Sequence, residues 1–140
     1  VSELKSLNLE GVVLAEPTTF MNDSGKAVKS LLRNSVSKCE ETEFLSENLI
    51  VVHDDLDIPL GEFKIQKNCG SAGHKGDQSI IDALGTKDFN RIRIGICPEN
   101  GKPADIEKFV LQKFTKTEEK ILTQIIQSAI DSVVGLANHR

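Results

Sequence analysis

The sequence contains no apolar run long enough to cross a bilayer, so it predicts a protein that is not inserted in a membrane. It also contains no internal repeat, low-complexity tract or linker-like segment, and its 140 residues predict a single domain, residues 1–140. The three cysteines, Cys39, Cys69 and Cys97, lack the spacing of a metal site or of a CxxC pair. They predict reduced thiols in a cytoplasmic protein.

Charge is unevenly distributed along the chain, although the formal net charge is only −4. Every charged residue from Glu40 to Asp57 is acidic, whereas cations outnumber acids from Lys64 to Arg93. The negative net charge argues mildly against coating of nucleic acid over the whole surface. The basic stretch could still meet a polyanion at one site, or it could be an ordinary solvated surface of mixed charge.

Hydrophobic spacing predicts four strands. Residues 11–17 and 49–55 are short apolar runs, and the second is typical of a buried parallel strand that ends in carboxylates. Strict alternation over residues 61–68 and 91–97 predicts two more strands. The alternation also predicts which side chains of these two strands face inward: Phe63, Ile65, Ile92, Ile94 and Ile96.

Helical periodicity separates and follows these strands. Residues 24–36 predict a helix with Asp23 or Ser24 as its cap, and residues 77–85 predict a short helix that ends at a glycine. The predicted fold is therefore α/β, with a mixed, twisted sheet sandwiched between helices.

A longer amphipathic helix is predicted near the end of the sequence. Thr115 and Glu118 form a capping box at its start. Its apolar stripe, which we expect to pack on the sheet, comprises Ile121, Leu122, Ile125, Ile126, Ala129, Ile130, Val133 and Val134.

Three carboxylates, Asp54, Asp55 and Asp57, crowd the end of the strand predicted at 49–55. Two of them could hold Mg²⁺ together with substrate phosphates. Alternatively, one could orient a histidine that acts as a general base. A plain polar turn before Pro59 would require neither kind of site.

The stretch GSAGHKG, residues 70–76, matches neither the GxGxxG dinucleotide pattern nor a Walker loop, in which Ser or Thr follows the lysine. It predicts a flexible loop that leads into a helix N-terminus, where free N–H groups favour an anion. His74 could act there as a base or a hydrogen-bond donor, or it could simply be a turn residue.

Asn22 follows the strand predicted at 11–17, where a helix begins. Its amide could cap that helix, or it could project into the same cleft as Asp54. Phe20 could offer a stacking face to a base or a sugar, or it could pack into the core.

Three stretches together resemble the bacterial-type peptidyl-tRNA hydrolase family, in the same order and at similar separations. They are PTTFMNDSGKAV, VVHDDLDIPLG and GSAGHKGDQSIIDALGTKDFNRIRIGI. The stretch FVLQKFTKTEEKIL also resembles the segment before that family's C-terminal helix.

The resemblance implies a cytoplasmic, monomeric carboxylic ester hydrolase that needs no cofactor or metal. Such an enzyme cleaves the ester between a peptide and the 3′ ribose of its tRNA, which recycles tRNA from stalled translation. Its base is a histidine that activates a water and is held by an aspartate, and Asp54 matches that aspartate. The resemblance assigns substrate or tRNA binding to Phe20, Asn22, Gly73, His74 and Lys75.

Two departures from the family pattern stand out. Lys75 replaces the usual asparagine, so a role for the amide oxygen is lost, although a cation could contact phosphate or a developing oxyanion. The family's first strand and the segment with the catalytic histidine have no counterpart, since His53, His74 and His139 lie in other contexts. We therefore expect an N-terminally truncated chain with impaired activity.

Other classes of function are also compatible with these residues. The chain could bind tRNA without cleaving it, or it could use His74 and Asp54 as a substitute dyad. A Mg²⁺-dependent phosphotransfer enzyme would use Asp55 and Asp57. The hydrolase interpretation expects Asn22, Asp54 and the loop 70–76 to line one pocket shaped for an acylated RNA end.

Overall fold

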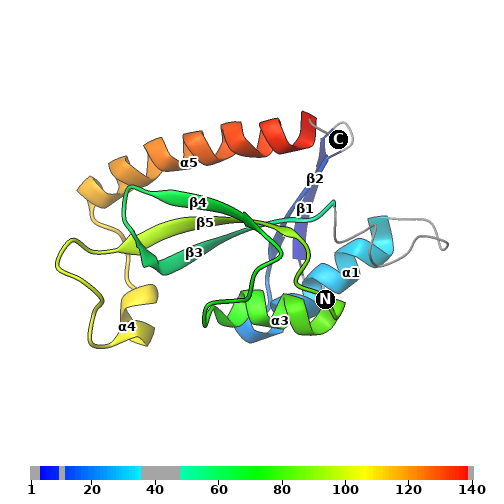
Figure 1. Cartoon of the computed structure of the whole chain (residues 1–140), viewed down its shortest axis with the longest axis horizontal. Helices are drawn as coiled ribbons and strands as arrows, with labels where there is room; N and C mark the ends of the chain where they lie inside the picture. The colour runs from blue at the N-terminus through cyan, green and yellow to red at the C-terminus, as the bar shows by residue number, and fades with distance from the viewer. Residues whose placement is uncertain (1–3, 10–11, 36–47, 139–140) are drawn as a thin grey trace. The chain divides into compact units, whose positions relative to one another are not determined.

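The computed structural model describes residues 4–9, 12–35 and 48–138 (Figure 1). The chain divides into two compact units. The first unit is Val1–Leu49 with Lys67–Asn90, and the second unit is Ile50–Gln66 with Arg91–Arg140. The single domain over residues 1–140 stays a prediction. In the described part of the chain, no helix is both long and apolar enough to cross a membrane.

The first unit begins with an antiparallel strand pair. β1 (Leu4–Leu9) pairs with β2 (Val12–Pro17) from Leu4 opposite Pro17 to Leu9 opposite Val12. β2 confirms the strand predicted at residues 11–17. β1 was not predicted, because its three leucines do not alternate with a period of two.

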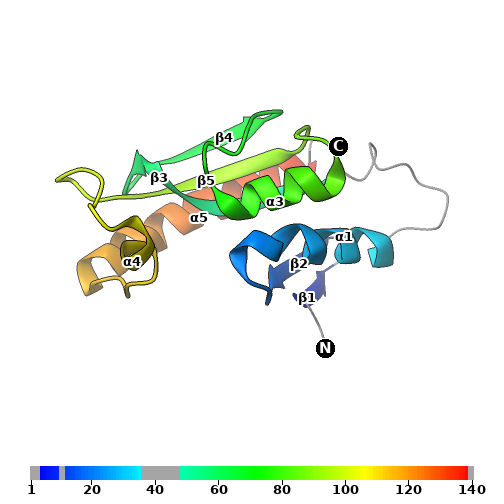
Figure 2. The ribbon, with the colours of Figure 1, turned by 90° about the horizontal axis from the view of Figure 1, so that it is seen from below.

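Two helices lie side by side in the first unit, α1 (Ser24–Ser35) and α3 (Lys75–Leu84), as Figures 1 and 2 show. Ala27 and Val28 of α1 and Ile80 of α3 are buried. α3 ends at Gly85, whose φ of 70° is the left-handed conformation that glycine favours, as the sequence predicted.

The start of α1 depends on α3 rather than on a local cap. A short 3₁₀ helix, η1 (Met21–Asp23), precedes α1, and the Ser24 hydroxyl donates to the carbonyl of Met21 at 2.7 Å. The N–H of Gly25 donates instead to Oγ of Ser79 on α3, at 2.9 Å. The cap predicted from Asp23 or Ser24 is thus replaced by a hydroxyl that lies 54 residues away in the chain.

The second unit contains a mixed three-stranded sheet. Its strands are β3 (Ile50–Pro59), β5 (Asn90–Cys97) and β4 (Phe63–Lys67), in the order β3–β5–β4. β3 and β5 run parallel, because Leu49 accepts from Asn90 at one end and Cys97 accepts from Leu60 at the other. β4 runs antiparallel to β5 (Figure 1). This architecture confirms the predicted α/β class with a mixed sheet.

Burial of the strands differs from the sequence-based expectation. β3 is an outer strand among the described residues, and Val52 on it is 54% exposed, so the prediction of a buried strand is wrong. Ile65 of β4 is 45% exposed, although alternation predicted that it faces inward. β5 lies between two strands and buries Arg91 as fully as Ile92, at 0% exposure. Periodicity identifies residues on one face but not which face other elements cover.

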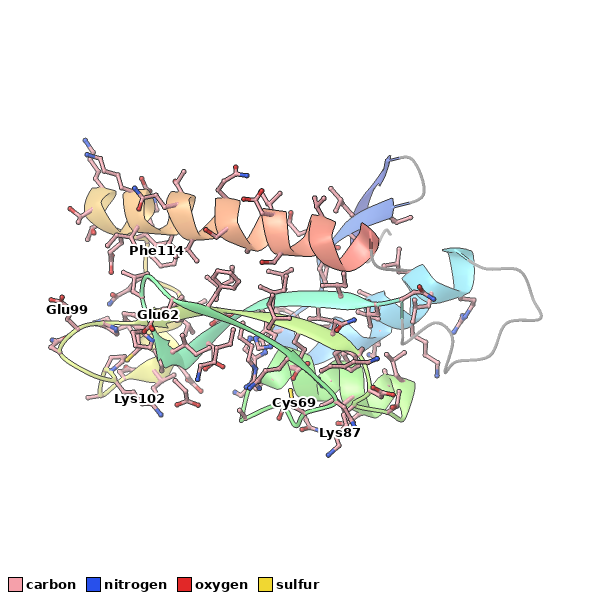
Figure 3. The ribbon with its side chains drawn as sticks, turned by 45° about the horizontal axis from the view of Figure 1, so that its top comes forward. Glu62, Cys69, Lys87, Glu99, Lys102 and Phe114 are labelled. Carbon is pink, nitrogen blue, oxygen red and sulfur yellow. The ribbon has the colours of Figure 1, made fainter. Side chains whose placement is uncertain are left out.

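Two helices complete the second unit, α4 (Ile106–Val110) and α5 (Lys116–Asn138), and Phe114 lies between them (Figure 3). The capping box is confirmed: Thr115 N–H donates to Glu118 Oε1 at 2.8 Å, and Glu118 N–H donates to Thr115 Oγ1 at 3.2 Å. α5 runs along one face of the sheet (Figure 1). The predicted stripe is too wide. Leu122 and Ala129 are buried and Ile121, Ile125 and Val133 are partly buried, but Ile126, Ile130 and Val134 are each about half exposed.

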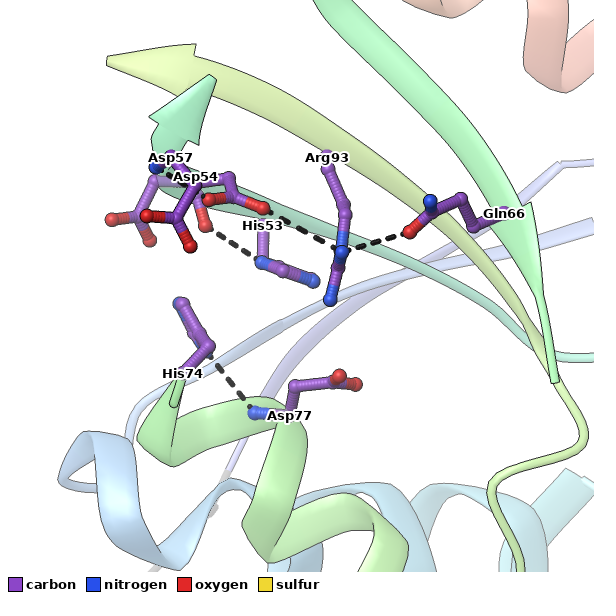
Figure 4. Close-up of polar contacts among 8 residues, drawn as sticks. His53, Asp54, Asp57, Gln66, His74, Asp77 and Arg93 are labelled. Carbon is purple, nitrogen blue, oxygen red and sulfur yellow. Dashed lines mark hydrogen bonds and ion pairs between the residues drawn. The ribbon is translucent and has the colours of Figure 1, made fainter. Parts of the chain in front are cut away.

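A buried ion pair ties the three strands together (Figure 4). Arg93 on β5 lies with its Nε 3.6 Å from Oδ2 of Asp55 on β3, and its Nη1 donates to Oε1 of Gln66 on β4 at 2.8 Å. Arg93 and Asp55 are each only 8% exposed. Asp55 also accepts from the N–H of Asp57 at 2.8 Å. The side chains that alternation predicts to face inward on this strand, Ile92, Ile94 and Ile96, do not include Arg93.

We expect Gly25→Ala to lower the free energy of unfolding by about 1–3 kcal/mol, the usual cost of overpacking a filled site. The added methyl carbon would lie 2.7 Å from Cβ of Ala83 and closer still to the carbonyl of Ser79. Urea unfolding measures the change. In the control Gly135→Ala, within α5, the added Cβ meets nothing within 4 Å, so this variant should be at least as stable as the parent. Equal stability of the two variants would contradict close packing of α1 on α3.

We expect Asp55→Ala to destabilise the protein by about 3–5 kcal/mol, because it leaves the Arg93 guanidinium buried without its counter-charge. The matched variant Asp57→Ala removes a carboxylate that is exposed and pairs with an exposed lysine, so it should change stability little. Thermal and urea unfolding of both variants provide the comparison. An Asp55→Ala protein as stable as Asp57→Ala would show that the buried pair does not hold the strands.

Candidate functional site

The residues before α1 present an aromatic side chain and an amide to solvent. Phe20 directly precedes η1 and is 83% exposed, and Asn22 within η1 is exposed as well. An open pocket beside them is lined by Thr18, Thr19, Phe20, Asp23 and Lys26. The alternative that Phe20 packs into the core is therefore wrong, and its ring is available for stacking.

The glycine-rich loop ends in the N-terminus of α3. Gly73 has a φ of 85°, a conformation that side chains with a Cβ rarely adopt, and nothing lies within 4 Å of where that Cβ would be. His74 is the N-cap of α3, and its Nδ1 accepts from the N–H of Asp77 at 3.1 Å. Because Nδ1 accepts, the neutral imidazole carries its proton on Nε2. His74 therefore caps α3 as a hydrogen-bond acceptor, and a role for it as a base or as a donor to substrate stays a prediction.

The first unit brings these two segments together. Gly76 in α3 is buried, and a Cβ there would lie 2.5 Å from Sδ of Met21 and 3.3 Å from Oγ of Ser24. η1 thus lies against the first turn of α3, where Lys75 is the first helical residue and is exposed. An exposed ring, an amide, an ammonium and a helix N-terminus consequently share one region of the first unit.

Asp54 lies in the middle of β3 of the second unit, half-buried, rather than at the end of a strand as predicted. The strand continues to Pro59, so the three carboxylates belong to an extended segment and not to a turn. His53 precedes Asp54, and its Nδ1 lies 2.7 Å from the carbonyl oxygen of Asp54 (Figure 4). The pocket expected to join Asp54 with Asn22 and the loop 70–76 stays a prediction.

The two carboxylates that follow Asp54 along β3, Asp55 and Asp57, face cations. Asp55 pairs with buried Arg93, and Asp57 forms an ion pair with Lys102, which projects from the connection between β5 and α4 (Figure 3). The hydrogen bond and the charge of Asp57 raise the pKa of the Lys102 ammonium. Both carboxylates that a magnesium site would need are thus engaged by positive side chains. Within the ranges that the structure describes, no group of three His, Cys, Asp or Glu side chains could hold a metal ion.

Sequence reasoning missed two features of this region. One is the Arg93–Asp55 pair. Its sequence signal is an arginine and an aspartate within two strands predicted to be buried, because a buried charge needs a partner. The other is the contact of His53 with Asp54, for which the only sequence signal is their adjacency. His139 and Cys39 lie outside the described residues, as does most of the acidic stretch from Glu40.

Comparison with known proteins identifies the family. The family model described as Peptidyl-tRNA hydrolase matches residues 1–139. A peptidyl-tRNA hydrolase of Thermodesulfovibrio yellowstonii is 46% identical over 134 residues, which cover 94% of this chain and 67% of that protein. One from Aquifex aeolicus is 44% identical over 122 residues, which cover 85% of this chain and 58% of that protein.

Solved structures agree with these matches. The crystal structure of peptidyl-tRNA hydrolase from Acinetobacter baumannii superposes with a TM-score of 0.76 at 27% identity, over 96% of this chain and 65% of that one. The chain thus spans about three fifths to two thirds of the length of the proteins it matches. The expectation of impaired activity gains no support, because relatives match up to 94% of this chain. The chain belongs to the peptidyl-tRNA hydrolase family.

Proposed function

We propose that the protein hydrolyses the ester that joins a peptide to the 3′ ribose of tRNA. The family match over residues 1–139 carries this proposal. The first unit supports it, since an exposed aromatic ring and a cation beside a helix N-terminus suit a nucleotide end with its phosphates. We further propose that the protein acts as a monomer in the cytoplasm and requires no cofactor.

The reaction needs a base, a water and a polarised ester. The base takes a proton from the water, whose oxygen attacks the ester carbonyl carbon and forms a tetrahedral oxyanion. Collapse of this intermediate breaks the bond between the carbonyl carbon and the ribose oxygen. The ribose oxygen takes up a proton, which gives free tRNA, and the peptide leaves with a new carboxyl group. We assign Asp54 the role of holding the histidine base, and we assign no histidine of this sequence as that base.

The remaining residues are proposed to bind substrate. Phe20 stacks on a base or sugar, and Asn22 positions the ester with its amide. Gly73 lets the backbone approach the RNA end, His74 donates from Nε2, and Lys75 contacts phosphate or the developing oxyanion. These roles come from the family resemblance, and the exposure of Phe20, Asn22 and Lys75 and the hydrogen bond at the start of α3 support them.

We expect Asp54→Asn to lower kcat for N-acylaminoacyl-tRNA by about 10²–10⁴-fold, since an amide cannot hold an imidazolium as a carboxylate does. Release of the acylated amino acid from tRNA measures the rate. Asp131→Asn, on the exposed surface of α5, is the control and should retain the parent rate. A parent protein that binds tRNA but never cleaves the ester would instead favour a binding module.

We expect Lys75→Ala to weaken binding of deacylated tRNA and to reduce the slope of log K against log salt concentration by about 0.7–0.9, the loss of one phosphate contact. Filter binding over a range of salt concentrations measures this slope. The control Lys29→Ala removes an exposed lysine of α1 and should leave the slope unchanged. An unaltered slope in Lys75→Ala would exclude a phosphate contact, and in that case Lys75→Asn should raise activity by restoring an amide.

A further inference from the structure

We propose that His53 is a positioning residue that directs the side chain of Asp54, and this inference rests on the proposed role of Asp54 in hydrolysis. His53 Nδ1 lies 2.7 Å from the carbonyl oxygen of Asp54. A carbonyl oxygen only accepts, so Nδ1 carries a proton and donates it to this bond. His53 is half-buried, which restricts the alternatives open to its ring.

The hydrogen bond joins two atoms that are also linked through the backbone, so the two links together form a closed ring that includes the α-carbon of Asp54. The ring runs from the imidazole of His53 through the peptide bond to the carbonyl of Asp54, and it contains both φ and ψ of Asp54. These two torsions determine the direction in which Cβ of Asp54 leaves the strand. A bond that holds them therefore also limits where the carboxylate can point.

The strand on which Asp54 lies is restrained by side chains. β3 is an outer strand among the described residues. His53 supplies a donor to the carbonyl of Asp54 on this strand. On the other side of Asp54, the next residue is anchored as well, because Asp55 faces Arg93 and accepts from Asp57 N–H. Asp54 thus lies between two residues whose side chains are fixed.

Two substitutions separate the hydrogen bond from the bulk of the ring. Nδ2 of asparagine can occupy the place of Nδ1 and donate the same bond, so His53→Asn should keep kcat near that of the parent. Leucine fills a similar volume without a donor, so His53→Leu should lower kcat by roughly 10–100-fold with little change in KM, as expected when a catalytic group is misplaced by about 1 Å. Equal loss in both variants, or no loss in His53→Leu, would overturn the proposal.

A second measurement does not depend on activity. The three-bond HN–Hα coupling of Asp54, measured by NMR, reports φ and should keep the value of an extended strand in the parent and in His53→Asn, and an averaged value in His53→Leu. The same coupling in all three proteins would overturn the positioning role. If the couplings follow the expected pattern but the parent does not hydrolyse peptidyl-tRNA, the proposed function fails while the positioning of Asp54 stands. Thermal unfolding of each variant identifies effects that come from loss of the fold.

Discussion

The buried guanidinium of Arg93 is the constraint on which the second unit depends. A charge placed in the interior without a partner costs several kcal/mol, so the fold must supply an anion and further acceptors at this point. Asp55 on β3 and Gln66 on β4 do so, and one side chain of the central strand thereby engages both of its neighbours. A shift of either outer strand would remove a partner and leave charge buried. The electrostatic requirement therefore helps to set which residues of β3 lie beside β5.

Asp54 inherits its position from this arrangement. The next residue, Asp55, pairs with Arg93 and so anchors the strand one residue away from Asp54. The imidazole of the preceding residue, His53, contacts the carbonyl oxygen of Asp54. Candidate catalytic groups need to be held within fractions of an ångström of their productive geometry. An outer strand gives little such restraint by itself, since half of its peptide groups have no neighbouring strand. In this protein, the side chains of His53 and Arg93 add restraint to β3 on both sides of the Asp54 α-carbon along the chain.

Two histidines near the candidate residues use the same nitrogen in opposite ways. Nδ1 of His74 accepts a hydrogen bond from the backbone N–H of Asp77, whereas Nδ1 of His53 donates to a carbonyl. Neutral His74 is consequently protonated on Nε2 and suited to donate to a substrate oxygen, while protonation of its Nδ1 would break the helix cap. The backbone group that each ring meets thus decides its tautomer, and the tautomer decides which chemistry the other nitrogen can perform.

The sequence by itself determined the elements that depend on neighbouring residues. An apolar run predicted β3, and alternation predicted β4 and β5. Gly85 predicted the end of α3, and Thr115 with Glu118 predicted the start of α5, because each of these signals acts over a few residues. The motifs also indicated the family and the candidate site residues. Only the tertiary structure decided what covers each face and which distant groups meet. It buried Arg93 against Asp55, exposed Phe20, and started α1 with a hydroxyl from Ser79, since burial and long-range hydrogen bonds depend on partners that periodicity does not specify.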